Sequence, residues 1–447
     1  MNRSLIRLVL CASLWPATAI SLPGRAAGQG ASDSMPVVTL AEARRRAARI
    51  DPQAVAARGQ FETAAWERRA AVASLLLPTV TATTSYVRLS DPFFNFGTGE
   101  ITRSSTNATL QAGYTLLGTR KLSELKRSRA GLEQAEAGET AAGFRVALAT
   151  DISFYAVLAD GELARVAADR LRRAEEQFGV ARVRVQAGEA ISSDSLRLFL
   201  EVNRARFGVL QRDSALTVAR LRLGRQIGLD GPAGAAPLDS AQPPPLPLTL
   251  EQAVTELRRS GPELQAARAA ERGADAALSA ERMTYLPEIT LGAVTGAYDA
   301  EFFPSALRRS QAAITVSMPV WNGGQREVAI ARARAQRDVA TAERRESERA
   351  AREAVAEAYH GYETARAGSE LATVGLTVAS EDYRVQRARY QEGATTILDL
   401  MEAQVALSEA QASLVQARYA TRLALARLEA LLGRRIFETG TNPPGLR

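Results

Sequence analysis

One stretch near the C-terminus, Arg389–Gln404, reads RYQEGATTILDLMEAQ and decides how the chain folds. The residues before Gly393 follow a helical pattern, and glycine is common just after the C-terminus of a helix. The helical pattern resumes after Thr396. Asp399 and Glu402 then share one helix face, because they lie three positions apart. The stretch therefore predicts a turn between two helices, followed by an acidic face.

The helices on either side of such turns are expected to be long. No proline occurs from Phe93 to Gly231 or from Val320 to Asn442, and proline would break a helix interior. These windows are rich in Ala, Arg, Leu, Glu and Gln, which favour helices. A helix of about 70 residues is roughly 100 Å long, which indicates a coiled hairpin or a tube. The expected long helices are 119–187, 194–228, 325–392 and 396–432.

The pattern occurs twice in the chain. Val38–Ala43 resembles Leu248–Ala253, and the sequence around Gly188 resembles that around Gly393. The matching motifs keep their order, which indicates a duplication. Each copy also has a shorter helix that begins at a proline, and we expect it to stack end to end with the helix after the turn as a partner for the long helix. The shorter helices are Pro52–Leu76 and Pro262–Tyr285. The expected divisions are a first repeat over 28–231, a Pro-rich linker over 232–248, a second repeat over 249–434 and a tail over 435–447.

Alternating apolar residues precede each long helix. Every second residue is apolar from Ala108 to Leu116 and from Ala312 to Val320, a pattern typical of strands with one apolar face. We expect paired strands over about 79–117 and 288–321, with outer loops at Leu89–Ser105 and Asp299–Ser310. Each strand has about the 9–11 residues of a transmembrane β-strand. Four strands cannot close a barrel, since small barrels need about eight, so two, three or four chains must combine.

The N-terminal segment predicts export. Arg3 and Arg7 precede the apolar run Leu8–Leu22, which contains an Ala-x-Ala site at Ala17–Ala19, with Ala26–Ala27 as a later alternative. Residues 1–27 are therefore interpreted as a secretory signal peptide. No later segment has the about 20 apolar residues of a spanning helix. The net charge of +7 is distributed over helix faces of mixed Arg and Glu without interleaved aromatic residues, which argues against a nucleic-acid partner.

The composition excludes most enzyme chemistry. Cys11 is the only cysteine and His360 the only histidine, so neither a disulfide framework nor a site with several His ligands is possible. The two lysines, Lys121 and Lys126, do not lie in a phosphate-binding loop. We therefore expect no enzyme activity, no metal site and no cofactor.

These features together resemble the TolC-like outer-membrane efflux proteins. The resemblance rests on the duplicated halves, on the junction Pro319–Arg326, and on Arg389–Gln404, which is close to the family pattern Tyr-x-x-Gly…Leu-Asp-x-x-(Asp/Glu)-Ala-Gln. It implies a mainly α-helical homotrimer. Its twelve-stranded transmembrane β-barrel would lie in the outer membrane of a Gram-negative-type bacterium and continue into the periplasm as a long α-helical barrel.

The resemblance also implies a gate at the periplasmic end of the helices. Asp399 and Glu402 match positions that form an acidic constriction; without the resemblance, a solvated helix face is the ordinary interpretation of such a pair. Tyr390 matches a residue that tethers the closed gate through hydrogen bonds.

Two further sets of residues belong to this expected gate. Thr395 replaces the tethering arginine that some relatives have, so Asp194 and Arg197, at the equivalent turn of the first repeat, are candidates for a compensating pair. Gly188 and Gly393 are expected at the tip where a periplasmic adaptor docks, although each is also an ordinary helix-capping glycine.

The expected function is a passive exit duct. An inner-membrane pump, either proton-driven or of the ABC type, would supply the energy through the adaptor. The main alternative is a periplasmic coiled-coil adaptor or scaffold protein. An adaptor has one helical hairpin with lipoyl-type β-segments, whereas this sequence predicts two hairpins and paired amphipathic strands. The cargo stays open between drugs, metal ions and proteins.

Overall fold

Both halves of the chain contain the same elements in the same order. The computed structural model describes residues 35–95, 99–188, 191–238, 243–299 and 307–437. The expected signal peptide and residues 438–447 of the expected tail lie outside them. The first half comprises α1 (Leu40–Ile50), α2 (Pro52–Leu76), β2 (Thr79–Asn95), β3 (Glu100–Leu117), α3 (Thr119–Gln186) and α4 (Ser192–Gln226). The second comprises α5 (Leu250–Ser260), α6 (Pro262–Met283), β5 (Glu288–Asp299), β6 (Leu307–Ser317), α7 (Gln325–Gln391) and α8 (Ile397–Leu432).

The short helices α1 and α5 were not anticipated. Each begins at a threonine of the duplicated motif: the side chain of Thr39 accepts a hydrogen bond from the backbone N–H of Glu42, and Thr249 forms a capping box with Gln252. Such caps satisfy backbone donors that the first helical turn leaves free. The repeated sequence around Thr39 and Thr249 therefore encodes helix starts. β1 (Val37–Val38) and β4 (Gly234–Ala235) form a further short parallel pair.

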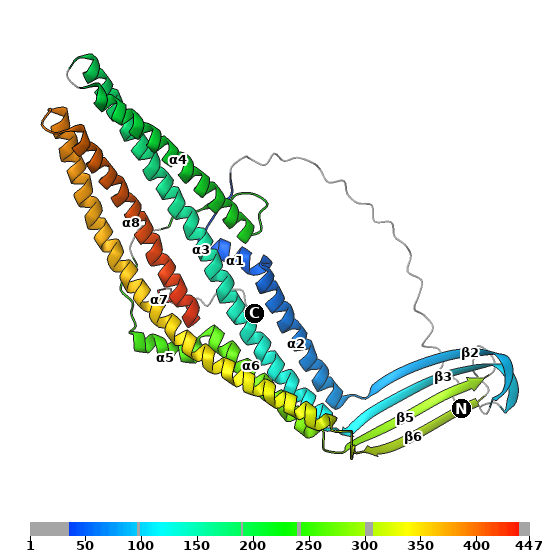
Figure 1. The fold of residues 1–447 in the computed structure, drawn as a ribbon. Helices are drawn as coiled ribbons and strands as arrows, with labels where there is room; N and C mark the ends of the chain where they lie inside the picture. Colours follow the sequence, from blue (N-terminus) through cyan, green and yellow to red (C-terminus); the bar gives the residue numbers. More distant parts are fainter. Residues whose placement is uncertain (1–34, 96–98, 189–190, 239–242, 300–306, 438–447) are drawn as a thin grey trace, which may run out of the picture. The chain divides into compact units, whose positions relative to one another are not determined.

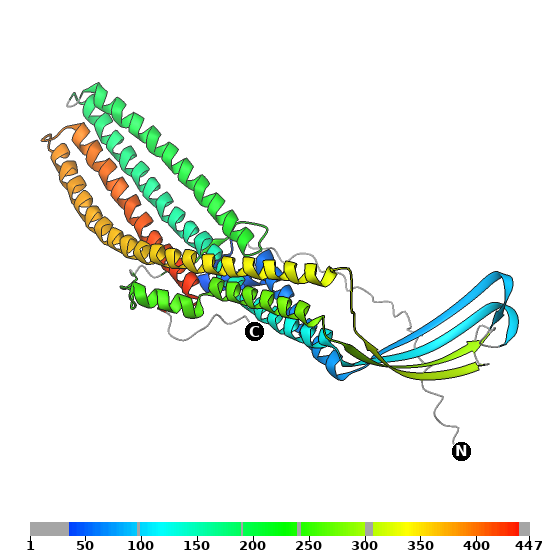
Figure 2. The same cartoon turned by 60° about the horizontal axis from the view of Figure 1, so that its bottom comes forward.

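Strands β2, β3, β5 and β6 form one antiparallel sheet in that order (Figure 2). The pairing of β3 with β5 joins the two halves of the chain. The segment Leu89–Ser105, expected to be an outer loop, is largely strand. The hydrogen-bonded pairing of β2 with β3 shifts register after Arg88 and resumes with Phe93 opposite Thr102. A β-bulge of this kind lets a strand continue past irregular sequence. β2 and β6 are the two edges of the sheet.

Each long helix packs against two shorter ones. α3 packs against α2 and α4, and α7 packs against α6 and α8 (Figure 1). α3 also contacts α6 and α8, which joins the halves. In the half near the strands, the helices therefore lie in the order α2-α3-α6-α7, which matches the order of the strands. In the half near the turns the order is α4-α3-α8-α7, so α4 and α7 are its edges.

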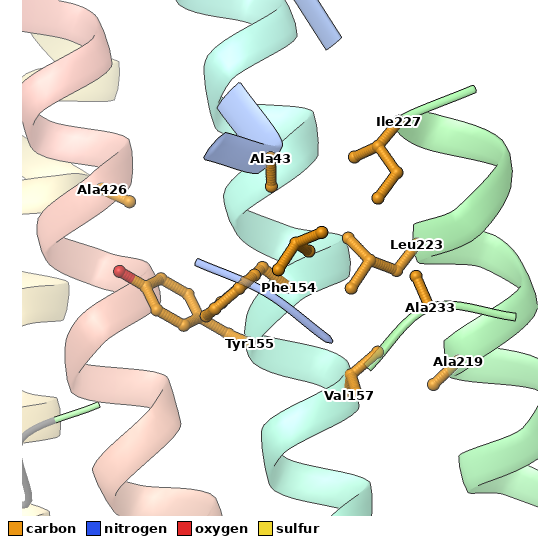
Figure 3. Close-up of a cluster of buried hydrophobic side chains, with 10 residues drawn as sticks. Ala43, Phe154, Tyr155, Val157, Ala219, Leu223, Ile227, Ala233 and Ala426 are labelled. Atoms are coloured by element: carbon orange, nitrogen blue, oxygen red, sulfur yellow. The ribbon is translucent and has the colours of Figure 1, made fainter. Parts of the chain in front are cut away.

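A buried apolar cluster packs three of the long helices together. Phe154 and Tyr155 of α3 form a buried cluster with Leu223 of α4 and Ala426 of α8 (Figure 3). An 18-residue window of α3 is apolar enough, by length and composition, to cross a membrane, and 44% of it is buried. The sequence did not predict such a segment. Its apolar residues are accounted for by packing, because α3 contacts five other helices: α1, α2, α4, α6 and α8.

A buried ionic network connects elements from both halves. Asp151 of α3 is 1% exposed and accepts two hydrogen bonds from Arg44 of α1, at 2.6 and 2.8 Å. Arg435, which follows α8, lies 3.7 Å from Asp151 and 2.6 Å from Glu429. The linker is anchored separately to α7, where the Tyr362 hydroxyl donates to the carbonyl of Pro244 at 2.6 Å.

Candidate functional site at the helix turns

The two long hairpins reverse direction at glycines with left-handed backbone angles. Gly188 has φ +76° and Gly393 has φ +73°. In the second turn, Gly393 N–H donates to the carbonyl of Tyr390 at 3.1 Å, and Ala394 N–H donates to that of Arg389 at 2.8 Å. This is a Schellman motif, which satisfies the last carbonyls of α7. No atom lies within 4 Å of where a Cβ of either glycine would be.

Asp399 folds back onto the start of α8. Its Oδ2 accepts hydrogen bonds from the hydroxyls of Thr395 at 2.8 Å and Thr396 at 2.7 Å, and from Thr396 N–H at 3.1 Å. The hydroxyl of Thr396 in turn accepts from the N–H of Asp399, completing a capping box. The hydrogen bonds from Thr396 and then Thr395 lower the pKa of Asp399, because they favour its charged form. The carboxylate therefore has a capping role in addition to its expected gate role.

Glu402 lies on the same face as Asp399, and both side chains are exposed. The opposite face of α8 is buried, with Leu400 and Ala403 packed in an apolar cluster. Two carboxylates are thus presented together, one turn and two turns after the reversal of the chain. This is the arrangement that an acidic constriction requires, although in the single chain the pair simply faces solvent.

Tyr390 joins the two hairpins through packing. Its side chain is 8% exposed and lies in a cluster with Ala181 of α3, Leu198 of α4 and Ile397 of α8. Burial raises the pKa of the Tyr390 hydroxyl, the charge of Asp194 adds to the increase, and Arg184 opposes it. The charges of Asp194 and Arg184 thus both act on Tyr390, and the gate roles of Tyr390 and Asp194 stay predictions.

Arg184 makes the polar connection between the hairpins. From α3, its Nη1 donates to the carbonyl of Tyr390 at 2.9 Å and its Nη2 to that of Gln391 at 3.1 Å. Its guanidinium carbon also lies 5.4 Å from the centroid of the Tyr390 ring. A charged donor on two carbonyls at a helix end is a strong contact, because both hydrogen bonds are charge-assisted. Arg184 thus binds the C-terminal end of α7 through two hydrogen bonds.

Arg184 was not among the predicted gate residues, although the duplication contains a signal for it. Arg184 precedes Gly188 by four residues, as Arg389 precedes Gly393. In its own turn Arg389 donates to the carbonyl of Ala394 at 3.4 Å. The duplicated arginines therefore both bind turn carbonyls, one within its own hairpin and one across hairpins. Arg197 is exposed on α4, and no ion pair or hydrogen bond connects it to another described residue.

Further polar contacts follow the same boundary away from the turns. Gln177 donates to the Tyr383 hydroxyl at 3.1 Å, and Arg173 donates to Gln411 at 3.2 Å. Within the described ranges, no group of three or more His, Cys, Asp or Glu side chains is arranged to hold a metal ion. His360 is an exposed surface residue beside Glu363.

Comparison with known proteins finds similarity to outer membrane efflux proteins. The profile of the family described as "Outer membrane efflux protein" matches residues 253–434. "Outer membrane protein OprJ" of Pseudomonas aeruginosa is 27% identical over 286 residues, or 62% of this chain and 59% of OprJ, so the match spans less than two thirds of that relative. "Probable efflux pump outer membrane protein TtgC" of Pseudomonas putida is 25% identical over 357 residues, covering 76% of this chain and 72% of TtgC.

The fold is that of solved outer-membrane channels. The crystal structure of the Campylobacter jejuni CmeC outer membrane channel superposes with a TM-score of 0.76 at 14% identity, covering 89% of this chain and 87% of CmeC. The duplicated hairpins, the four-stranded sheet and the sequence matches agree. The chain is therefore similar to the outer membrane efflux protein family, and its fold is that of TolC-like outer membrane channels.

Proposed function

We propose that three copies of this chain form a passive exit duct, not an enzyme, across the outer membrane and periplasm. The observation that carries the proposal is the pair of open edges. β2 and β6 leave the sheet unclosed, and an unpaired strand edge in a membrane must find a partner because lipid offers no hydrogen bonds. Three four-stranded sheets would make the twelve-stranded barrel that the family resemblance implies.

The helical edges support the same assembly. Near the turns, α4 and α7 expose apolar side chains at helical spacing, a pattern that ordinarily packs against another helix. Those on α4 are Leu196, Phe199, Phe207 and Leu210; those on α7 are Leu371, Val374, Val378 and Val385. The two stripes also lie at the same distance along the helices from the turns. Phe207 follows Gly188 by 19 residues and Val374 precedes Gly393 by 19 residues. We infer that α4 of one copy packs against α7 of the next.

The gate lies at the helix turns in this proposal. Arg184 and Tyr390 hold the two hairpins of one copy together, and Asp399 and Glu402 of three copies provide six carboxylates around one axis. Arg197 of one copy is then available for a partner in the next copy. Opening requires the hairpins to separate, which breaks the hydrogen bonds of Arg184.

The energy and the partners must come from elsewhere in the cell envelope. We propose that a periplasmic adaptor docks at the turns around Gly188 and Gly393 and couples the duct to an inner-membrane pump, of the proton-driven or ABC type, for efflux or type I secretion. The alternative of a periplasmic adaptor is less well supported, since a four-stranded antiparallel sheet with two long hairpins is present.

The assembly is tested by disulfide formation between copies. Phe207→Cys with Val374→Cys, in a chain whose Cys11 is replaced by Ser, should form covalent trimers on oxidation because the two positions lie at the same height. Phe207→Cys with Val385→Cys is the matched control, since Val385 precedes Gly393 by eight residues. Monomers only, or equal cross-linking in both variants, would contradict the proposed ring.

A further inference from the structure

An apolar groove with a cationic side lies between α2 and α3, beside the start of β2. Its volume is about 620 Å³, and the residues that matter here are Arg68, Arg69, Val72, Leu76, Leu77 and Leu132. Leu76 and Leu77 are 74% and 62% exposed, so two large apolar side chains face solvent where the helix ends. Such an exposed apolar surface next to a transmembrane sheet needs a cover.

Arg68 and Arg69 form the cationic side of the groove. Neither Arg68 nor Arg69 forms an ion pair with any residue in the described ranges. Arg69 instead lies over the ring of Trp66, at 4.7 Å from its centroid, and that ring is 66% exposed. Other arginines of the same helices are paired, such as Arg58 with Glu139 and Arg127 with Glu281. Two adjacent guanidinium groups are thus left for an external anion.

The surroundings of the groove indicate the source of that anion. β2 begins at Thr79, three residues after the end of α2, so the groove adjoins the part of the chain that enters the membrane. Other strand–helix junctions also combine a cation with an aromatic ring: Lys121 Nζ lies 4.2 Å from the Tyr114 ring centroid, and Arg326 Cζ lies 4.4 Å from that of Tyr285. Both lysines of the chain, Lys121 and Lys126, lie in this region. Aromatic and basic side chains of this kind favour the membrane surface.

We propose that the groove binds an anionic phospholipid of the membrane leaflet that faces the periplasm. The phosphate of the lipid, together with an anionic or hydroxylated group on the same headgroup, would contact Arg68 and Arg69. The acyl chain would cover Val72, Leu76, Leu77 and Leu132. Arginine suits this role because its planar fork donates two hydrogen bonds to one phosphate. This inference rests on the proposed insertion of the sheet in the outer membrane.

Native mass spectrometry of the full-length assembly tests the inference, with an equal mixture of phosphatidylglycerol and phosphatidylethanolamine added in detergent. Wild type should retain phosphatidylglycerol several-fold better. Arg68→Gln with Arg69→Gln should abolish that preference, whereas Arg204→Gln with Arg212→Gln, which remove the same charge from α4, should keep it. Inorganic phosphate in excess should not displace the lipid, because it lacks the acyl chain. Displacement by phosphate would reduce the site to an anion site and overturn the lipid assignment.

Two readouts separate this inference from the proposed duct. Insertion into planar bilayers is measured on the same preparations. Channels without any headgroup preference would overturn the lipid site alone, while a wild type that never inserts would overturn the duct. A loss of the trimer mass in Arg68→Gln with Arg69→Gln, with lipid retention unchanged, would show that the groove is an interface between copies and would also overturn the lipid site.

Discussion

At the scale of single residues, the two carboxylates of the expected gate are not equivalent. Asp399 accepts three hydrogen bonds from the cap of α8, whereas Glu402 is exposed one turn further along. Removing Asp399 therefore disturbs a helix start as well as a charge, because Asp399 is the N3 partner of Thr396 in the capping box. Glu402 is the cleaner probe of charge.

Glu402→Gln should weaken the block of the channel by multivalent cations added on the periplasmic side. In the proposed trimer it would remove three of six carboxylates around the axis, and rings of carboxylates attract cations in pores. Single-channel recording with a trivalent cation measures the block. Glu409→Gln, an exposed charge two turns further along α8, should behave as wild type. An unaltered block in Glu402→Gln would make the acidic pair an ordinary solvated face.

Thr395→Val should raise the pH at which cation selectivity is lost. The hydroxyls of Thr396 and Thr395 lower the pKa of Asp399, so its charge and its capping contribution are fully present above the ordinary aspartate pKa of about 3.9 and are lost as the pH falls through the lower folded value. Without the Thr395 donor the pKa rises. Reversal potentials from pH 3 to pH 7 measure this shift; Thr377→Val, which removes a hydroxyl bonded to a backbone carbonyl, is the control. An unshifted or lowered midpoint would contradict the role given to Thr395.

Tyr390→Phe should raise resting conductance less than Arg184→Gln. Arg184 bonds to the carbonyls of Tyr390 and Gln391, and the substitution to Phe keeps these bonds as well as the buried ring. The family resemblance alone would instead assign the tether to the tyrosine hydroxyl. Bilayer conductance of the two variants shows whether the Arg184 hydrogen bonds or the Tyr390 hydroxyl hold the gate closed. Equal opening by both variants would favour the hydroxyl.

At the scale of helices and strands, most boundaries could be predicted because prolines and glycines set them. The ends of α3, α4, α7 and α8 lie within two residues of the expected ones. The prediction of a loop over Leu89–Ser105 was wrong. The β-bulge after Arg88 lets the strands continue, and it depends on pairing between two strands, which a local sequence pattern does not show. Arg184 was missed for a similar reason: its partner is on another hairpin, and a contact between distant segments leaves no local pattern.

The glycines that end the helices should differ in their tolerance of a side chain. Gly393→Ala should cost about 1–2 kcal/mol from the left-handed backbone alone, since its surroundings are open. Gly433→Ala should cost more, because Gly433 has the same φ of +73° and a Cβ there would lie 2.9 Å from Pro262 Cδ and 3.0 Å from the Ser260 carbonyl. Thermal unfolding of the detergent-solubilised protein compares them. A smaller loss for Gly433→Ala would contradict this packing.

At the scale of the whole molecule, the two repeats have diverged into complementary parts. β3 and β5 join the repeats within one sheet, and α3 with α8 joins them near the turns. The outer elements of each half, β2 with β6 and α4 with α7, remain as edges. Duplication therefore produces a layer of helices and strands with two different edges. In the proposed assembly, a ring of copies joins these edges and closes the duct. No single chain contains the finished duct in this account.

The central claim is that the resting duct is held shut by contacts between hairpins at the turns. The most direct test is single-channel recording of wild type, Arg184→Gln and Arg182→Gln in planar bilayers. Arg182 is an exposed arginine two residues away on α3, so its substitution removes the same charge without the tether. The account predicts low-conductance channels for wild type and Arg182→Gln, and a severalfold higher resting conductance for Arg184→Gln. Equal conductance of all three proteins, or a failure of wild type to insert, would contradict it.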